Sequence, residues 1–281
     1  MKLNILIFLF ITSGFSGVYS KSINIKRDIL YAAHYHGAPK NLLDIYYPKN
    51  TDVQKNVLVF IHGGSWNSGR KETYWWLGEN MAKKNVVTVI INYRLSPEYQ
   101  YEAMANDCAA SLKWVRDSIS AYGGRSDRIF VMGHSSGGHL ASLINSDPRF
   151  FEQQGIPNPI FGLILDDGFG LDMFDYLNAA VKSELNDSFL VTFSKDREVW
   201  KTGSPINYLN NIHNPYLIFV GEHTYPAIRI QSVRLFDELS KANKTAEIKF
   251  IKHKKHVGMI SHMIFPGNRM YDMILDFMKR Y

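Results

Sequence analysis

Short apolar runs alternate with longer amphipathic segments along most of the chain. The runs are rich in β-branched residues and are bounded by Gly, Pro, Asn and Asp, which is typical of strands covered on both faces. We therefore predict buried strands at Val57–Ile61, Val86–Ile91, Ile129–Met132, Phe161–Leu165, Tyr216–Val220 and Glu247–Ile251. The intervening segments predict helices at Ala103–Ser118, Gly138–Ile144 and Ala227–Ala242.

This alternation predicts an α/β fold with a mostly parallel central sheet and helices on both faces. Two further segments, Leu43–Tyr47 and Ile23–Tyr31, are predicted as edge strands at the front of the chain. One long stretch, residues 168–211, has an irregular pattern and is rich in aromatic residues. Because long insertions in compact domains are usually functional, it is predicted to form a small lid, the alternative being an ordinary crossover helix with surface loops.

The first twenty residues have a pattern of their own. Lys2 is their only charge, an apolar run follows over Leu3–Ile11, and the segment ends with Val18-Tyr19-Ser20. A positive tip, a short apolar run and small residues before the cleavage point are typical of a secretory signal peptide. The run is shorter than the roughly 20 residues that span a bilayer. We expect a signal peptide at 1–20, a secreted or periplasmic protein over 21–281, and no membrane span after cleavage, the alternative being an uncleaved anchor.

Composition narrows the function classes. The 281 residues are 46% hydrophobic and 21% charged, which predicts a folded globular chain. The net charge of +6 is scattered, apart from a basic run at 252–255, and forms no basic stripe of the kind that binds nucleic acid. The one cysteine, Cys108, leaves no partner for an internal disulfide and is expected to be a small buried hydrophobe.

The strongest chemical motif is Gly133-His134-Ser135-Ser136-Gly137, which follows a predicted strand and opens a predicted helix. In that context Gly-x-Ser-x-Gly indicates a sharp strand-to-helix turn with the serine exposed at its tip. The pattern alone is weak, because chains of this length contain it by chance about one time in ten. The strand before it and the helix after it make Ser135 the candidate nucleophile.

A second motif, His62-Gly63-Gly64-Ser65-Trp66, directly follows the first predicted strand. Acyl transfer passes through an oxyanion, which is stabilised by preorganised backbone N–H groups. Glycine lets the backbone approach a substrate oxygen closely. The N–H groups of Gly63, Gly64 and Ser136 are therefore the candidate oxyanion donors, and Trp66 is predicted to line the substrate wall.

Together these motifs resemble the carboxylesterase branch of the α/β hydrolases, which includes acetyl-esterase, feruloyl-esterase-like and kynurenine-formamidase-like enzymes. The similarity runs from about Leu42 to the C-terminus, and Asn92–Glu98 looks like a tyrosine-arginine-leucine segment of that branch. The resemblance implies ester or amide hydrolysis through an acyl-serine, a nucleophile–acid–histidine order along the chain, and neither metal nor organic cofactor.

The catalytic base is then expected after the last strand, where His253 and His256 lie. His256 starts the segment that looks like the loop entering the final helix, where the family's histidine sits, and catalytic groups are often on loops. We predict His256 as the base. His139 lies inside the helix after Ser135 and is expected to pack rather than react.

The acid is less clearly indicated. Relatives commonly carry an aspartate in a Gly-x-x-Asp pattern after the Tyr216–Val220 strand, but Thr224 occupies that position here. Some hydrolases carry the acid after the preceding strand, which favours Asp167, and a related stretch also aligns Asp172. Glu222 is the second candidate. The third possibility is an impaired relay, because loss of such an acid costs on the order of 10⁴-fold in kcat.

Three functions are therefore compatible with the sequence. The first is an exported carboxylesterase acting on a small or medium acyl ester, with Ser135, His256 and Asp167 as its triad. The second is an amide or formamide hydrolase on the same scaffold. The third is a catalytically impaired binding protein, suggested by Thr224. The oligomeric state and the acyl and alcohol groups are not indicated by the sequence.

Overall fold

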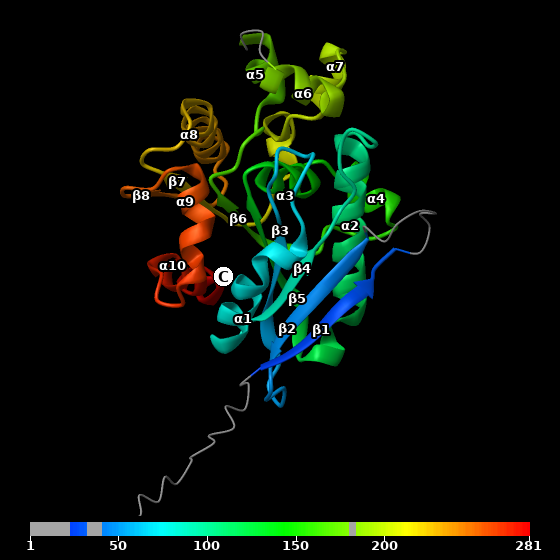
Figure 1. The fold of residues 1–281 in the computed structure, drawn as a ribbon, viewed down its shortest axis with the longest axis vertical. Coiled ribbons are helices and arrows are strands. Elements are labelled where there is room, and N and C mark those ends of the chain that lie inside the picture. Colours follow the sequence, from blue (N-terminus) through cyan, green and yellow to red (C-terminus); the bar gives the residue numbers. More distant parts are fainter. Residues whose placement is uncertain (1–22, 33–40, 180–183) are drawn as a thin grey trace, which may run out of the picture.

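Eight strands form a single sheet in the computed structural model, which describes residues 23–32, 41–179 and 184–281. The strand order is β1-β2-β4-β3-β5-β6-β7-β8 (Figure 1). The first two pairs, β1 with β2 and β2 with β4, are antiparallel, and all later pairs are parallel. The strands are β1 Ile23–Leu30, β2 Leu42–Pro48, β3 Lys55–Ile61, β4 Val87–Ile91, β5 Gly124–His134, β6 Ile160–Asp166, β7 Tyr216–Gly221 and β8 Ala246–Ile251. The predicted mostly parallel sheet is confirmed, and a strand is present at each predicted place. Two details are corrected: β2 lies between β1 and β4 rather than at an edge, and β8 is an edge strand with half-buried and exposed residues rather than a buried strand.

Side chains alternate between two cores, one on each face of the sheet. On β3, Val57, Val59 and Ile61 join one cluster, whereas Leu58 and Phe60 join the other. This period of two is expected for a strand buried on both sides. Helices α2, α3 and α8 contribute residues to the first core, and α1, α9 and α10 contribute to the second. The layered α/β architecture therefore follows from continuous apolar strands.

The helices extend the predicted set. The three predicted helices are present as α2, α3 and α8, each with slightly different ends. The α-helices are α1 Trp75–Lys83, α2 Tyr101–Ser118, α3 Ser136–Ser146, α4 Arg149–Gln153, α5 Met173–Ala179, α6 Glu184–Phe193, α7 Arg197–Thr202, α8 Pro226–Lys241, α9 His256–Ser261 and α10 Arg269–Arg280. Short 3₁₀ turns lie at η1 Lys71–Tyr74, η2 Ile119–Tyr122, η3 Pro205–Asn211 and η4 His262–Ile264.

The stretch at 168–211 is not irregular, which corrects the prediction. Its described part contains α5, α6, α7 and η3, and the three α-helices form a small cap at one end of the molecule (Figure 1). Each helix is short, so its apolar positions span too few turns to show a clear period of 3.6 residues. Phe169 and Phe189 from this stretch pack against Trp66, so the cap is joined to the main core. Its role as a lid stays a prediction.

Two predictions about the chain ends and the cysteine have different outcomes. The expected signal peptide at 1–20 lies outside the described residues and stays a prediction. Among the described helices, none is both long and apolar enough to span a bilayer. Cys108 is fully buried on α2, as expected, and burial raises the pKa of its thiol well above the ordinary value.

Candidate active site

Ser135 lies at the sharp turn between β5 and α3. Its backbone has φ 54° and ψ −123°, a region that costs energy for a residue with a side chain. The turn brings the backbone of Gly137 against Ile61 and His62, and a Cβ on Gly137 would overlap their carbonyl oxygens. The glycine of the motif is therefore required by close approach. The predicted strand–serine–helix turn is present.

The loop after β3 passes directly beside this turn. A Cβ on Gly63 would lie 2.8 Å from the His134 carbonyl oxygen and 3.0 Å from the Ser135 Cβ, so only glycine fits without displacing the turn. Within the described part of the chain, no acceptor is recorded for the N–H groups of Gly63, Gly64 and Ser136. Ser136 is the first residue of α3, where backbone N–H groups have no intrahelical partner. The three predicted oxyanion donors therefore belong to two segments in contact.

His256, the first residue of α9, reaches Ser135. Its Nε2 lies 2.9 Å from the Ser135 Oγ, and its Nδ1 lies 2.7 Å from Asp167 Oδ2. Because an acidic oxygen faces Nδ1, the proton of a neutral ring is expected there, which leaves Nε2 free to accept the serine proton. His253, the other histidine considered, is a highly exposed residue that contacts Glu222 instead. The geometry therefore brings together the predicted base and the predicted nucleophile.

Asp167 follows β6 and is completely buried. It has φ 53°, a second strained position close to the serine. Its Oδ1 accepts a hydrogen bond of 2.8 Å from the Gly221 N–H, and its own N–H donates to the Phe219 carbonyl at 3.0 Å. These contacts fix the carboxyl group at the junction of β6 and β7, facing His256.

Thr224, which replaces the usual aspartate after β7, donates its hydroxyl to Asp167 Oδ2. Strands β6 and β7 are direct neighbours, with Asp166 paired to Phe219, so the loops that follow them meet. A carboxyl group from either loop can therefore reach the same histidine. Here the carboxylate that contacts His256 comes from the β6 loop, and the β7 loop contributes a hydroxyl that donates to this carboxylate.

The other two acid candidates have different partners. Glu222 accepts a 2.7 Å hydrogen bond from the His253 N–H and lies near the rings of His223 and His253. Asp172 lies 2.8 Å from the guanidinium of Arg234, and this ion pair links the cap to α8. Neither contact involves His256, so the structure separates both from the serine–histidine pair.

Trp66 is not a wall of an open pocket, which corrects the prediction for this residue. Its side chain is completely buried. The indole N–H donates to His139 Nδ1 at 3.1 Å, and rings of the cap surround it, with Phe193 at 5.0 Å and Phe189 at 5.4 Å between centroids. A large amphipathic ring is buried when its N–H finds an acceptor. Trp66 therefore anchors the Gly63–Trp66 loop to α3 and to the cap.

His139, which was expected to pack, is buried and is hydrogen-bonded on both ring nitrogens. Its Nε2 donates to the Gly203 carbonyl at 2.7 Å, while Nδ1 accepts from Trp66. Burial lowers the pKa of His139 to about 4, so the ring is neutral at pH 7. It is a structural link between α3 and the cap.

Two contacts of His256 were not predicted from the sequence. The His134 ring stacks on it with 4.9 Å between centroids, and burial, followed by the neighbouring His256, lowers the pKa of His134 to about 3. The exposed Tyr225 ring lies 5.3 Å from His256 on the solvent side. For His134, the sequence signal was its position inside the serine motif, next to Ser135. Tyr225 follows Thr224, but nothing in its local pattern indicates the contact.

The sequence is similar to those of known proteins. A family model described as BD-FAE matches residues 43–239. Over 277 residues the chain is 28% identical to a probable isoprenylcysteine alpha-carbonyl methylesterase, ICMEL2, of Arabidopsis thaliana, which covers 92% of this chain and 64% of that protein. The chain thus spans less than two thirds of the length of this curated relative.

Solved structures give a matching fold. A truncated carbohydrate esterase from gut microbiota has a TM-score of 0.79 at 20% identity, covering 93% of this chain and 97% of that chain. Esterase B from Lactobacillus rhamnosis has a TM-score of 0.78 at 21% identity, covering 92% of this chain and 86% of that chain. The predicted α/β-hydrolase fold is confirmed.

Proposed function

Because the chain belongs to the BD-FAE family, we propose that it is a serine carboxylesterase that cleaves a small or medium acyl ester through an acyl-serine intermediate. The observation that carries the proposal is the continuous contact from Ser135 Oγ through the His256 ring to Asp167. A nucleophile, a base and a group that orients the base are the three parts that acyl transfer needs.

Acylation begins at Ser135. His256 Nε2 takes the hydroxyl proton as Oγ attacks the ester carbonyl carbon, and the carbonyl electron pair moves to the oxygen. The tetrahedral intermediate collapses, the bond to the alcohol oxygen breaks, and His256 gives the proton to the departing alcohol. Asp167 holds the Nδ1 side of the ring and stabilises the imidazolium that forms.

Deacylation repeats the same steps with water. His256 removes a proton from water, the hydroxide attacks the acyl carbon, and the proton returns to Ser135 as the acid leaves. The oxyanion of both intermediates would lie at the N–H groups of Gly63, Gly64 and Ser136. Such donors are effective because they are oriented before charge develops, and each is worth about 3 to 4 kcal/mol in the transition state.

The substrate side of the site is exposed and apolar. Tyr225 is 62% exposed and lies against His256, and Val257, the next residue along α9, is 66% exposed. We infer that these two side chains, rather than the buried Trp66, contact the acyl or alcohol group. The similarity to a probable methylesterase and to esterase B supports ester substrates for this site.

The first test is hydrolysis of p-nitrophenyl acetate together with labelling by a fluorophosphonate, which reacts with activated serines. We expect Ser135→Ala to lose the label and at least about 10⁴-fold in kcat. The matched control is Ser240→Ala, because Ser240 is an exposed serine on α8 whose hydroxyl donates to the Phe236 carbonyl, far from the proposed triad. Turnover that survives unchanged in Ser135→Ala would contradict the proposal, and faster cleavage of p-nitroacetanilide than of the ester would favour an amidase.

The second test concerns the acid. We expect Asp167→Asn to lower kcat by about 10⁴-fold while KM changes little, because the amide no longer selects the reactive form of the histidine. Asp237→Asn, on the exposed face of α8, is the matched control. An Asp167→Asn variant with wild-type kcat would remove Asp167 from the proposed triad.

A further inference from the structure

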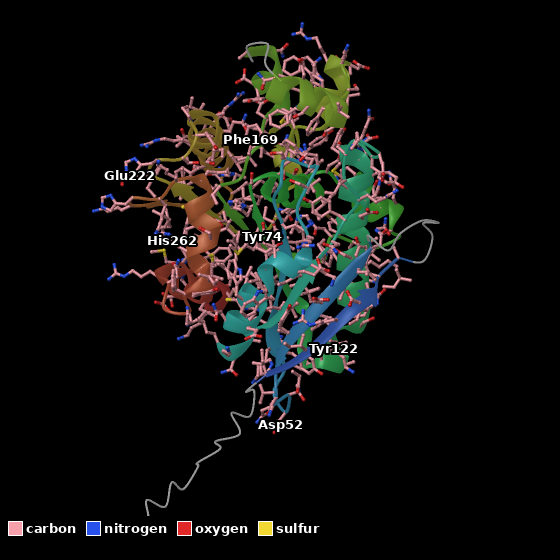
Figure 2. All side chains as sticks on the ribbon, viewed as in Figure 1. Asp52, Tyr74, Tyr122, Phe169, Glu222 and His262 are labelled. Carbon is pink, nitrogen blue, oxygen red and sulfur yellow. The ribbon has the colours of Figure 1, made fainter. Side chains whose placement is uncertain are left out.

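Glu222, His223 and His253 form a cluster of ligand-type side chains outside the proposed catalytic site. The first two follow β7, and the third follows β8. Figure 2 shows Glu222 at the outer edge of the molecule, away from Tyr74 near its centre. One ligand atom from each residue lies within 4.8 Å of those of the other two. The cluster therefore brings together two imidazoles and a carboxylate from two separate loops.

Distances between these atoms are close to those of a metal site. Glu222 Oε2 lies 3.7 Å from His223 Nε2 and 3.6 Å from His253 Nδ1. Zinc bonds of about 2.0 to 2.1 Å in a tetrahedron place neighbouring ligand atoms about 3.3 to 3.4 Å apart. Two of the three distances between ligand atoms are thus close to that length. The third distance joins the two imidazoles, whose side chains are 57% and 86% exposed and can rotate to shorten it.

The backbone holds the two loops in this arrangement. The Glu222 N–H donates to the Ile251 carbonyl at 3.0 Å, and the His223 N–H donates to the Lys254 carbonyl at 2.8 Å. The His253 N–H donates to Glu222 Oε2 at 2.7 Å, which orients the carboxylate while leaving its other lone pairs available. A ligand oriented by a second hydrogen bond is typical of metal sites.

The ligand chemistry selects the class of cation. Two imidazoles with one carboxylate suit zinc and similar transition metals, with water completing the coordination, whereas calcium and magnesium prefer oxygen ligands alone. The neighbouring Lys252 contributes positive charge near Glu222, so coordination by the imidazole nitrogens rather than net negative charge must supply most of the affinity. Lys254 contacts His262 instead, so its ammonium group is engaged outside the cluster.

We propose that Glu222, His223 and His253 bind one divalent cation of the zinc class and that this cation bridges the loops after β7 and β8. The site is independent of the proposed hydrolase activity, because none of its ligands contacts the serine–histidine–aspartate group. The loop after β7 also carries Thr224, and the loop after β8 leads directly into α9 at His256, so the cation would restrain the edge of the sheet where these residues lie.

The test is metal binding by the tag-free full chain after treatment with EDTA. We expect one Zn²⁺ per chain by calorimetry, and visible absorption of tetrahedral Co²⁺ that Zn²⁺ abolishes. Glu222→Gln and His253→Asn should each weaken binding at least about tenfold, since loss of even an outer contact costs 10- to 100-fold. The midpoint of thermal unfolding should rise with Zn²⁺ in the wild type and not in His253→Asn.

His213→Asn is the matched control, because His213 is an exposed histidine outside the cluster, and it should bind as the wild type does. His256→Ala tests for metal on the proposed catalytic histidine and should also leave the Co²⁺ spectrum in place. Absence of saturable Zn²⁺ binding would overturn the proposal. Binding that persists in His253→Asn but is lost in His256→Ala would overturn it too, because the metal would then lie at the triad.

Discussion

At the scale of single residues, Thr224 and Asp167 act as one hydrogen-bonded unit beside His256. The Thr224 hydroxyl is bonded to the same carboxyl oxygen that faces His256. Hydrogen bonds to charged groups contribute about 1.5 to 3 kcal/mol. We therefore expect Thr224→Val, which keeps the shape and removes the donor, to lower kcat of p-nitrophenyl acetate hydrolysis about tenfold or more, with little change in KM. Circular dichroism should show an unchanged fold, and wild-type kcat would mean that the hydroxyl is dispensable.

A second variant at Thr224 tests whether a carboxyl group at this position can take the place of the hydroxyl donor. Thr224→Asp restores the residue type of relatives, but it places a second carboxyl group against the buried Asp167. Two carboxylates this close cannot both ionise easily, so one would take up a proton and disturb the contact with His256. We expect lower kcat than in Thr224→Val and a changed pH–rate profile. Activity above the wild type would indicate that Asp167 is a poor acid in the natural protein.

At the scale of elements, Trp66 connects three segments: the Gly63–Trp66 loop, α3 and the cap helix α6. It does so by a hydrogen bond to His139 and by ring contacts with Phe189 and Phe193. Truncating a buried tryptophan typically costs about 3 to 5 kcal/mol. We expect Trp66→Ala to lower the free energy of unfolding by that amount in urea titrations and to reduce esterase activity, because the oxyanion loop loses its anchor. Trp75→Ala, at a 46% exposed tryptophan on α1, should change it by about 1 kcal/mol or less.

The strands and the serine turn could be predicted because their signals are local. The run over Val57–Ile61 is apolar at every position, and the Ser135 motif stands directly between a strand and a helix. The identity of the acid depends on β6 and β7 being neighbours, which a local pattern does not contain, so Asp167 could be proposed only by resemblance. Trp66 was misinterpreted for a similar reason. Its burial is caused by cap residues more than 100 positions away along the chain.

At the scale of the whole molecule, the carboxyl edge of the sheet buries an unusual set of ionisable groups. Burial lowers the pKa of His62 to about 4, of His134 to about 3 and of His139 to about 4. Asp166 is buried as well, and burial with the adjacent Asp167 raises the pKa of its carboxyl group well above 3.8. Both Asp166 oxygens have no hydrogen-bond partner within the described residues. The three histidines are therefore uncharged in the folded protein at pH 7, and the Asp166 carboxyl group keeps its proton to a higher pH than an ordinary aspartate does.

The buried histidines and the buried Asp166 change the stability of the folded protein with pH in opposite directions. Below the ordinary histidine pKa of 6.5, the unfolded chain binds protons at the three histidines while the folded chain does not, so stability is lost as pH falls. From pH 3.8 up to the raised pKa of the folded state, the unfolded chain releases the Asp166 proton while the folded chain keeps it, so stability is lost as pH rises through that range. Between about pH 4 and 6.5 the three histidines outweigh the one aspartate, and each unmatched proton corresponds to about 1.4 kcal/mol per pH unit, so stability falls as pH falls.

Stability should therefore decline steeply as pH falls below about 6.5, whereas the Asp166 proton lowers stability as pH rises. Urea unfolding at pH 5, 6, 7 and 8 measures this curve directly. Asp166→Asn keeps the shape of the side chain and removes its proton, so it should flatten the alkaline side and make the acid side steeper. Asp237→Asn, exposed on α8, should keep the wild-type curve. A free energy of unfolding that stays constant from pH 5 to 8 would contradict this prediction. It would mean that water reaches these four groups in the folded protein and keeps their pKa values ordinary.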